Sequence, residues 1–164
     1  MREIAEGTSA DLRVIASIYE HYVAASAHTF DVEPPTEAWW TDWFSTFQAE
    51  TPFRLVVARE DRGVVGYAYT GPYGERGGYA TSVTASVYVA PDERGRGLGS
   101  ALYDRLLPLL EGTDVHRAYA AIALPNPASI ALHERFGFVK VGQFSEQGYK
   151  IGRYWDVAWY ERPY

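Results

Sequence analysis

Residues 87–102 place the strongest constraint on the fold, because an apolar run stops there at a glycine-rich turn and a helical pattern follows. They read Val-Tyr-Val-Ala-Pro-Asp-Glu-Arg-Gly-Arg-Gly-Leu-Gly-Ser-Ala-Leu. Glycine lets the backbone approach a ligand closely, and a helix N-terminus favours bound anions. The segment therefore predicts a strand, a turn and a helix that bind a pyrophosphate. The alternative is a turn that only caps the helix.

Two common phosphate-binding motifs do not match this turn. A P-loop requires Lys followed by Ser or Thr, and residues 87–102 contain no Lys. A dinucleotide-binding fingerprint requires Gly-x-Gly-x-x-Gly, a spacing that Gly95, Gly97 and Gly99 do not supply. The pattern that remains is Arg94-x-x-Gly97-x-Gly99.

This pattern resembles the coenzyme A motif of the GNAT superfamily of N-acetyltransferases. That motif reads Arg or Gln, two residues, Gly, one residue, and then Gly or Ala. The preceding Val-Tyr-Val and the leucine-rich helical pattern that follows strengthen the resemblance. The resemblance implies acetyl-CoA as the co-substrate and no metal.

A second block, residues 123–138, resembles the late motif of the same family, in which an Asn caps a helix beside the pantetheine. It reads Ala-Leu-Pro-Asn-Pro-Ala-Ser-Ile-Ala-Leu-His-Glu-Arg-Phe-Gly-Phe. Seven residues after Asn126 the superfamily usually has Tyr, whereas this chain has His133, as in the phosphinothricin acetyltransferase branch. Early and late segments, such as Gly71-Pro72-Tyr73, agree with that branch, so the resemblance covers essentially the whole chain.

The hydrophobic pattern predicts a single domain, residues 1–164, of the α+β class. The expected helices span 9–25 and 37–47, a stretch from 97 that is disturbed at Pro108, and 127–137. The expected strands span 54–59, 64–70, 81–89, 118–124, 139–144 and 150–159. The resemblance implies a curved, mostly antiparallel mixed sheet with helices on both faces. Its central strands would splay apart and form the acetyl-CoA cleft.

Composition excludes several classes of function. The absence of cysteine rules out disulfides, Cys-ligated zinc, iron–sulfur clusters and a cysteinyl acyl-enzyme. The chain has 15 Lys and Arg against 21 Asp and Glu, a net charge of −6, which argues against a general binder of nucleic acid or anionic membranes. No stretch approaches the roughly 20 apolar residues of a membrane span, and the first residues lack a signal-peptide pattern. We therefore expect a cytoplasmic protein.

The resemblance assigns the coenzyme side of a candidate site. The backbone of Val87, Tyr88 and Val89 would hold the pantetheine, with the Val89 N–H as the catalytic oxyanion donor. The pyrophosphate would lie on N–H groups of Arg94, Gly95, Arg96, Gly97, Leu98, Gly99 and Ser100. Asn126 and Ser129 would contact the pantetheine arm. His133 would either act as the catalytic acid near the sulfur or only contact the coenzyme.

The acceptor side departs from the branch pattern. Phosphinothricin-type enzymes have a Glu base three residues before the Val-Tyr-Val that ends the strand, and this chain has Thr84 there, which cannot act as a base near neutral pH. Either another group deprotonates the amine, or the acceptor arrives neutral through water. His28, Glu33 and Glu75 are candidate bases on matching loops, or else solvated loop residues. The candidate acceptor-binding residues are Phe30, Glu33, Tyr73, Arg76 and Thr84. The guanidinium of Arg76 would suit a carboxylate.

The implied function is acetyl transfer from acetyl-CoA to a small amino-acid-like amine by direct attack in a ternary complex. Phosphinothricin, methionine sulfoximine and methionine sulfone are the nearest acceptors. Three alternatives stay open: another amine such as a polyamine or a peptide N-terminus, a catalytically silent acyl-CoA-binding or regulatory module, and a purely structural interaction domain. The aromatic residues of 39–47 and Phe30 suggest the walls of a small pocket, which favours a small acceptor. The resemblance also implies a homodimer.

Overall fold

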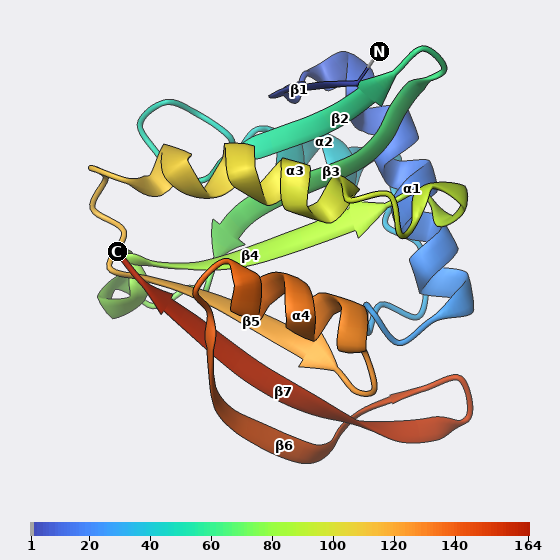
Figure 1. The fold of residues 1–164 in the computed structure, drawn as a ribbon, viewed down its shortest axis with the longest axis vertical. Coiled ribbons are helices and arrows are strands. Elements are labelled where there is room, and N and C mark those ends of the chain that lie inside the picture. The colour runs from blue at the N-terminus through green and yellow to red at the C-terminus, as the bar shows by residue number, and fades with distance from the viewer. Residues whose placement is uncertain (1) are drawn as a thin grey trace.

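The computed structural model describes residues 2–164, and their strands form one seven-stranded sheet (Figure 1). The strands are β1 (Glu3–Glu6), β2 (Leu55–Glu60), β3 (Gly63–Pro72), β4 (Ser82–Val89), β5 (Arg117–Ala123), β6 (Val139–Lys150) and β7 (Arg153–Pro163). Their order in the sheet is β1-β2-β3-β4-β5-β7-β6. β4 and β5 pair in parallel, and every other neighbouring pair is antiparallel. The expected α+β class with a mixed, mostly antiparallel sheet is therefore confirmed.

Helices cover both faces of the sheet, as expected. They are α1 (Leu12–Ala25), α2 (Glu37–Phe44), α3 (Leu98–Leu106) and α4 (Pro127–Arg135). α3 and α4 lie on the near face in Figure 1, and α1 and α2 lie behind the sheet. Successive side chains along a strand point to opposite faces of the sheet. Val57 packs with α1 and α2, whereas Val56 and Ala58 pack with α3. No helix within residues 2–164 is long and apolar enough to cross a bilayer.

The packing of α3 fixes the position of the glycine-rich turn before it. Leu98, Leu102 and Leu106 recur every four residues and are at most 1% exposed, so one face of α3 is sealed against the sheet. Burying such a leucine contributes roughly 1.5–3 kcal/mol. α3 stops before Pro108, and a 3-10 turn over Leu107–Leu110 follows, because proline has no N–H to continue the helix.

The structure differs from the sequence expectations most clearly in β1, α2, β6 and β7, and β7 spans Arg153–Pro163 instead of 150–159. The hydrophobic pattern does not predict β1, because a strand of four residues is too short to show a clear alternation of apolar and polar residues. β1 pairs only with β2, at the edge of the sheet. α2 ends at Phe44, three residues early, where Phe47 N–H turns back to the Phe44 carbonyl. β6 continues to Lys150, since Ile151 and Gly152 have positive φ and close a two-residue hairpin to β7.

The two parallel central strands stay paired over only three positions. Ser82 faces Arg117, Val83 faces Ala118 and Thr84 faces Tyr119. Beyond Thr84, β4 remains paired with β3 as far as Val89, while β5 follows β7 to Ala123. The strands therefore diverge towards their C-terminal ends, as their arrowheads show in Figure 1, and this divergence creates the expected splay.

Candidate functional site

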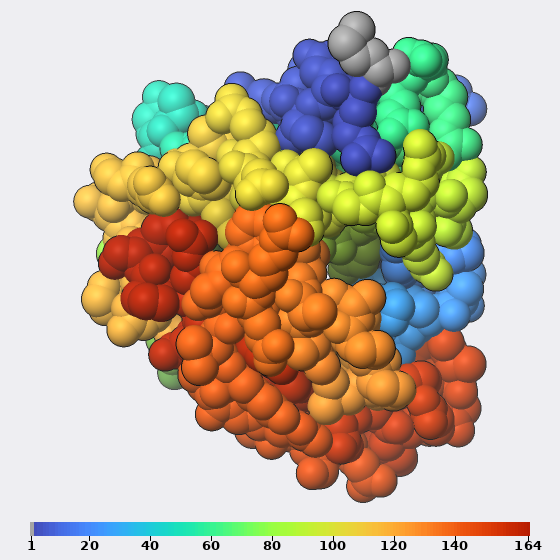
Figure 2. Space-filling model, in the orientation of Figure 1, coloured from blue at the N-terminus to red at the C-terminus, as the bar shows by residue number. Residues whose placement is uncertain are grey.

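The divergence of β4 and β5 opens a cavity of about 630 Å³. Figure 2 shows this face hollowed between the yellow-green turn before α3, the orange segment that contains α4 and the blue segment around the end of α1. Of the residues predicted on the coenzyme side, the cavity is lined by Val87, Tyr88, Val89, Arg94, Gly95, Gly97, Leu98, Gly99, Ser100, Asn126, Ser129 and His133. Arg96 is the exception within residues 2–164 and lies outside this cavity.

The turn before α3 presents unpaired N–H groups to the cavity. Gly95 and Gly97 both have φ of +76°, a conformation that other residues rarely adopt, and open space lies where a Cβ would stand. The first bond of the helix runs from Ala101 N–H to the Gly97 carbonyl at 3.1 Å. The N–H groups of Leu98, Gly99 and Ser100 therefore have no partner inside the helix. With the helix dipole behind them, they can bind an anion.

The end of β4 directs its peptide groups into the same cavity. Ala90 N–H donates to the Val65 carbonyl of β3 at 2.9 Å. Bonded positions alternate in an antiparallel ladder, so Tyr88 also bonds β3, whereas Val87 and Val89 direct N–H and C=O away from it. β5 no longer pairs with β4 at Val89, so no strand bonds the outward-facing Val89 carbonyl. The Tyr22 hydroxyl donates to that carbonyl at 2.6 Å. The Val89 N–H is thus free to face a ligand.

His133 is buried on α4 with both ring nitrogens engaged. Asn126 caps this helix and accepts from Ser129 N–H at 3.2 Å. His133 Nδ1 lies 2.8 Å from the Ser129 carbonyl, which only accepts, so Nδ1 carries the proton. Nε2 therefore accepts from the Tyr103 hydroxyl at 2.9 Å. Burial lowers the pKa of His133, which keeps the ring neutral and favours a contact residue over a proton donor.

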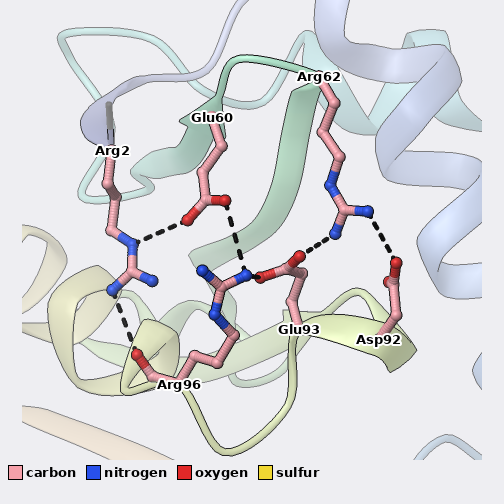
Figure 3. A network of polar contacts seen from close by, with 6 residues as sticks. All are labelled: Arg2, Glu60, Arg62, Asp92, Glu93 and Arg96. Carbon is pink, nitrogen blue, oxygen red and sulfur yellow. Dashed lines mark hydrogen bonds and ion pairs between the residues drawn. The ribbon is translucent and has the colours of Figure 1, made fainter.

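Arg96 turns away from the cavity into an ion-pair network (Figure 3). Both Arg96 and Arg62 pair with the Glu93 carboxylate, which is only 4% exposed. Arg62 also binds Asp92 at 2.8 Å, and Arg2 joins Glu60 at 3.2 Å. The network fastens the turn before α3 to the β2–β3 hairpin. Only the backbone of Arg96 therefore remains a candidate phosphate contact, because its guanidinium is committed to carboxylates.

Arg94 is the arginine that stays at the cavity. Its guanidinium carbon lies 5.0 Å from the centre of the Tyr22 ring, a cation–π contact that leaves the side chain beside the entrance of the turn. Of the two arginines in the turn, only Arg94 therefore lines the cavity, which Arg135 of α4 lines as well.

A second cavity of about 320 Å³ adjoins the first through His28, Ala121 and Ala123, which line both. Its walls come from the loop after α1, from β5 and from the β6–β7 hairpin: Ala27, His28, Phe30, Ala121, Ala123, Gln147, Gly148, Val157 and Trp159. Phe30 packs so closely over Gly148 that no Cβ fits there. This cavity is the natural place for a small second substrate.

Apart from His28 and Phe30, the residues predicted on the acceptor side lie outside both cavities. Glu33, Tyr73, Arg76 and Thr84 line neither cavity, and nor does Glu75. The Thr84 hydroxyl donates to the Gly71 carbonyl at 3.4 Å, and Tyr73 packs on Tyr119 with 4.7 Å between ring centres.

The aromatic residues of α2 do not form a pocket wall. Trp40 is 5% exposed and packs edge-on against Tyr19 and Trp43, inside the core between α1, α2 and the sheet. The expectation that the cluster 39–47 encloses a small acceptor is therefore not met at these cavities: of the proposed wall, only Phe30 lines either of the two.

Sequence reasoning missed the residues that hold the site together. Tyr22 fastens the end of β4, and Tyr103 holds His133. Lys150, 5% exposed, donates from Nζ to the Thr29 carbonyl at 2.7 Å and to the Tyr22 carbonyl at 3.3 Å. It thereby binds the hairpin to the loop that carries His28. No local pattern marks these residues, because their partners are distant in the sequence.

Comparison with known proteins identifies the architecture. Residues 15–138 match the family model described as the Acetyltransferase (GNAT) family. The chain belongs to this family. The enzyme class expected from the motifs, an N-acetyltransferase, is therefore confirmed.

The relatives of this acetyltransferase place it in the phosphinothricin N-acetyltransferase branch. It is 48% identical over 163 residues to the phosphinothricin N-acetyltransferase of Streptomyces coelicolor, covering 98% of this chain and 95% of the relative. It is 37% identical over 150 residues to the L-methionine sulfoximine/L-methionine sulfone acetyltransferase of Pseudomonas aeruginosa, covering 91% and 87%. A crystal structure of a GNAT superfamily phosphinothricin acetyltransferase from Sinorhizobium meliloti in complex with AcCoA superposes with a TM-score of 0.92 at 36% identity, covering 99% of this chain and 88% of that one.

Proposed function

We propose that this acetyltransferase moves the acetyl group of acetyl-CoA to the α-amine of a small amino acid analogue of the phosphinothricin or methionine sulfoximine and sulfone type. The observation that carries the proposal is the pair of adjoining cavities. The larger is lined by the anion-binding turn and by Val89, and the smaller shares His28, Ala121 and Ala123 with it. A long phosphorylated thioester and a small amine can therefore approach each other from opposite sides.

Each part of the larger cavity has a role in this reaction. The N–H groups at the start of α3 bind the pyrophosphate, and Asn126 and Ser129 line the path of the pantetheine arm. The Val89 N–H donates to the thioester oxygen as it becomes an oxyanion. His133, neutral and held by Tyr103, shapes the wall beside the sulfur.

The reaction is tested by incubating the protein with acetyl-CoA and an acceptor panel, and measuring free thiol. The panel holds phosphinothricin, methionine sulfone, methionine sulfoximine, a polyamine and a peptide. We expect thiol release with the amino acid analogues; release no faster than without acceptor would overturn the proposal. The protein has no cysteine and adds no background thiol. A silent module would still be stabilised by acetyl-CoA, by roughly 2.7 kcal/mol at a hundredfold excess over Kd, without any turnover.

The ion-pair network predicts an effect on coenzyme affinity alone. Replacing Arg62 by Gln leaves the buried Glu93 carboxylate less neutralised beside the pyrophosphate, and loosens the turn. We expect Kd for acetyl-CoA to rise about threefold to tenfold, measured by titration calorimetry, with kcat at saturating acetyl-CoA unchanged. The matched control is Arg13→Gln on the exposed surface of α1. Equal affinity of the two variants at low salt would contradict the prediction.

We also propose a homodimer, as the family resemblance implies. The hairpin of β6 and β7 has exposed apolar side chains, among them Val139, Val141, Phe144, Tyr149 and Tyr154, each more than half exposed. Apolar surface gathered on an edge strand is typical of an interface. Light scattering at micromolar concentration should give twice the mass of 18.4 kDa, and the monomer mass would reject the dimer.

A further inference from the structure

We propose that His28 is the general base that accepts the proton of the acceptor ammonium. The proposal rests on the proposed function, because it names the group that makes the amine nucleophilic. An amino acid α-amine is protonated near neutral pH, and only the free amine attacks a thioester. A group at the junction of the two cavities that receives this proton would let the enzyme use the abundant ammonium form, instead of waiting for the small fraction of free amine.

His28 lies at that junction. Its residue lines both cavities, and it is the only ionisable residue within 2–164 that does so. The centre of its ring is 5.8 Å from the centre of the Tyr22 ring, and the Tyr22 hydroxyl bonds the carbonyl of Val89. One aromatic ring therefore separates His28 from the residue whose N–H faces the thioester.

The other residues of the larger cavity that could accept a proton are not available as a base. Glu93 is the single carboxylate that lines either cavity in the described chain, and two arginines neutralise it. His133 uses both ring nitrogens, and the Tyr22 hydroxyl donates a hydrogen bond to the Val89 carbonyl. Burial raises the pKa of Tyr88 well above its ordinary value, so it is not a base near neutral pH.

The side chain of His28 is free to act. Within residues 2–164 no hydrogen bond joins its ring nitrogens to another residue, whereas its backbone N–H donates to Ser26 Oγ at 3.2 Å. Either nitrogen can therefore meet an ammonium or an intervening water.

The charges around His28 favour its neutral form. Three causes lower its pKa: partial burial first, then the positive charge of Arg94, and then that of Lys150. The charge of Arg94 comes from the turn before α3, and that of Lys150 comes from the end of β6. From α1, Tyr22 contacts His28 through its ring. Asp31 lies in the same loop as His28. Its carboxylate accepts a hydrogen bond from the Tyr19 hydroxyl at 2.7 Å, and its negative charge partly offsets the lowering of the Lys150 pKa by burial.

The proton balance of the step is complete. The ammonium gives one proton to a nitrogen of His28, and the free amine nitrogen then forms a bond to the thioester carbon while the carbonyl π pair moves to oxygen. The carbonyl re-forms as the C–S bond breaks, the electron pair of that bond leaves with sulfur, and one further N–H proton passes from nitrogen to the departing sulfur. The CoA thiolate takes one of the two protons, and the other passes to solvent from the His28 imidazolium.

The test compares His28→Gln with His21→Gln. His21 is the matched control, because its ring also contacts the Tyr22 ring, at 5.6 Å between centres, but lines neither cavity. We expect His28→Gln to lower kcat at pH 7 about a hundredfold, within the range for general base catalysis. Kd for acetyl-CoA should stay within about twofold in both variants, and His21→Gln should keep wild-type kcat.

The pH profile separates a base from a structural residue. In the wild type, kcat/KM should rise with pH through the lowered pKa of His28 and then level off, since the neutral imidazole is the active form. In His28→Gln this limb should vanish, leaving a rise set by the acceptor amine itself, and activity should recover as pH approaches the pKa of that amine. Imidazole added to His28→Ala should restore part of the rate.

The outcomes also distinguish this proposal from the proposed function. A wild-type protein that releases no thiol with any acceptor would reject the proposed function. Wild-type turnover together with a His28→Gln variant that keeps kcat within about threefold and the same pH profile would reject His28 as the base.

Discussion

Replacing Gly97 by Val is expected to weaken acetyl-CoA binding about a hundredfold, which corresponds to about 2.7 kcal/mol. Gly97 caps α3 with φ of +76°, where a β-branched residue is strained. The added side chain would also project into the open space over the N–H groups that receive the pyrophosphate. Titration calorimetry measures the affinity directly.

Gly112→Val is the matched control for this change. Gly112 has φ of +75° and also has open space at its Cβ position, but it lies in the turn before β5 and lines neither cavity. Both variants should lose stability by roughly 1–2 kcal/mol, because both force a side chain into the left-handed region. Only Gly97→Val should lose coenzyme affinity. A comparable loss in Gly112→Val would show that backbone strain, rather than the anion site, explains the effect.

Replacing Gly148 by Ala is expected to raise KM for the acceptor about tenfold and to leave KM for acetyl-CoA unchanged. A Cβ at this position would overlap the Phe30 ring, with Cζ only 2.6 Å away. Phe30 is 37% exposed, so its side chain can swing aside instead of unfolding the hairpin. The smaller cavity would then lose a wall, while the coenzyme cleft would keep its shape.

The control for Gly148 lies on the same strand. Gly142 has no atom near the position of a Cβ, so Gly142→Ala should leave both KM values unchanged. Steady-state kinetics with each substrate varied in turn separates the two KM values. If Gly148→Ala raised KM for acetyl-CoA as strongly as for the acceptor, the smaller cavity would not be the acceptor site.

Local patterns were sufficient to predict the parts of the cleft that depend on neighbouring residues. The turn with Gly95 and Gly97, the leucine face of α3 and the Asn126 cap each arise from residues a few positions apart. The splay of β4 and β5 came from family resemblance. No spacing in the sequence shows where two parallel strands stop pairing.

Contacts between distant residues decided the rest. The Arg96 N–H stays a predicted phosphate contact, but nothing in a glycine-rich turn reveals that Glu93 and Glu60 bind the guanidinium of Arg96 outside the cavity. Lys150 reaches the carbonyl of Tyr22 across 128 positions. The role of α2 was misjudged for the same reason, since an aromatic cluster looks alike whether it faces a cavity or the core.

The position of β7 also sets the order in which this enzyme can be completed on the ribosome. β7 is the last strand along the described chain, yet it lies inside the sheet, between β5 and β6. While residues 153–163 are still being synthesised, β5 exposes an unpaired edge, and Lys150 has no finished hairpin from which to bind the loop of His28. The half of the sheet with β1 to β4 can pair during synthesis, but the smaller cavity can close only after the final strand inserts, because Val157 and Trp159 of that strand line it.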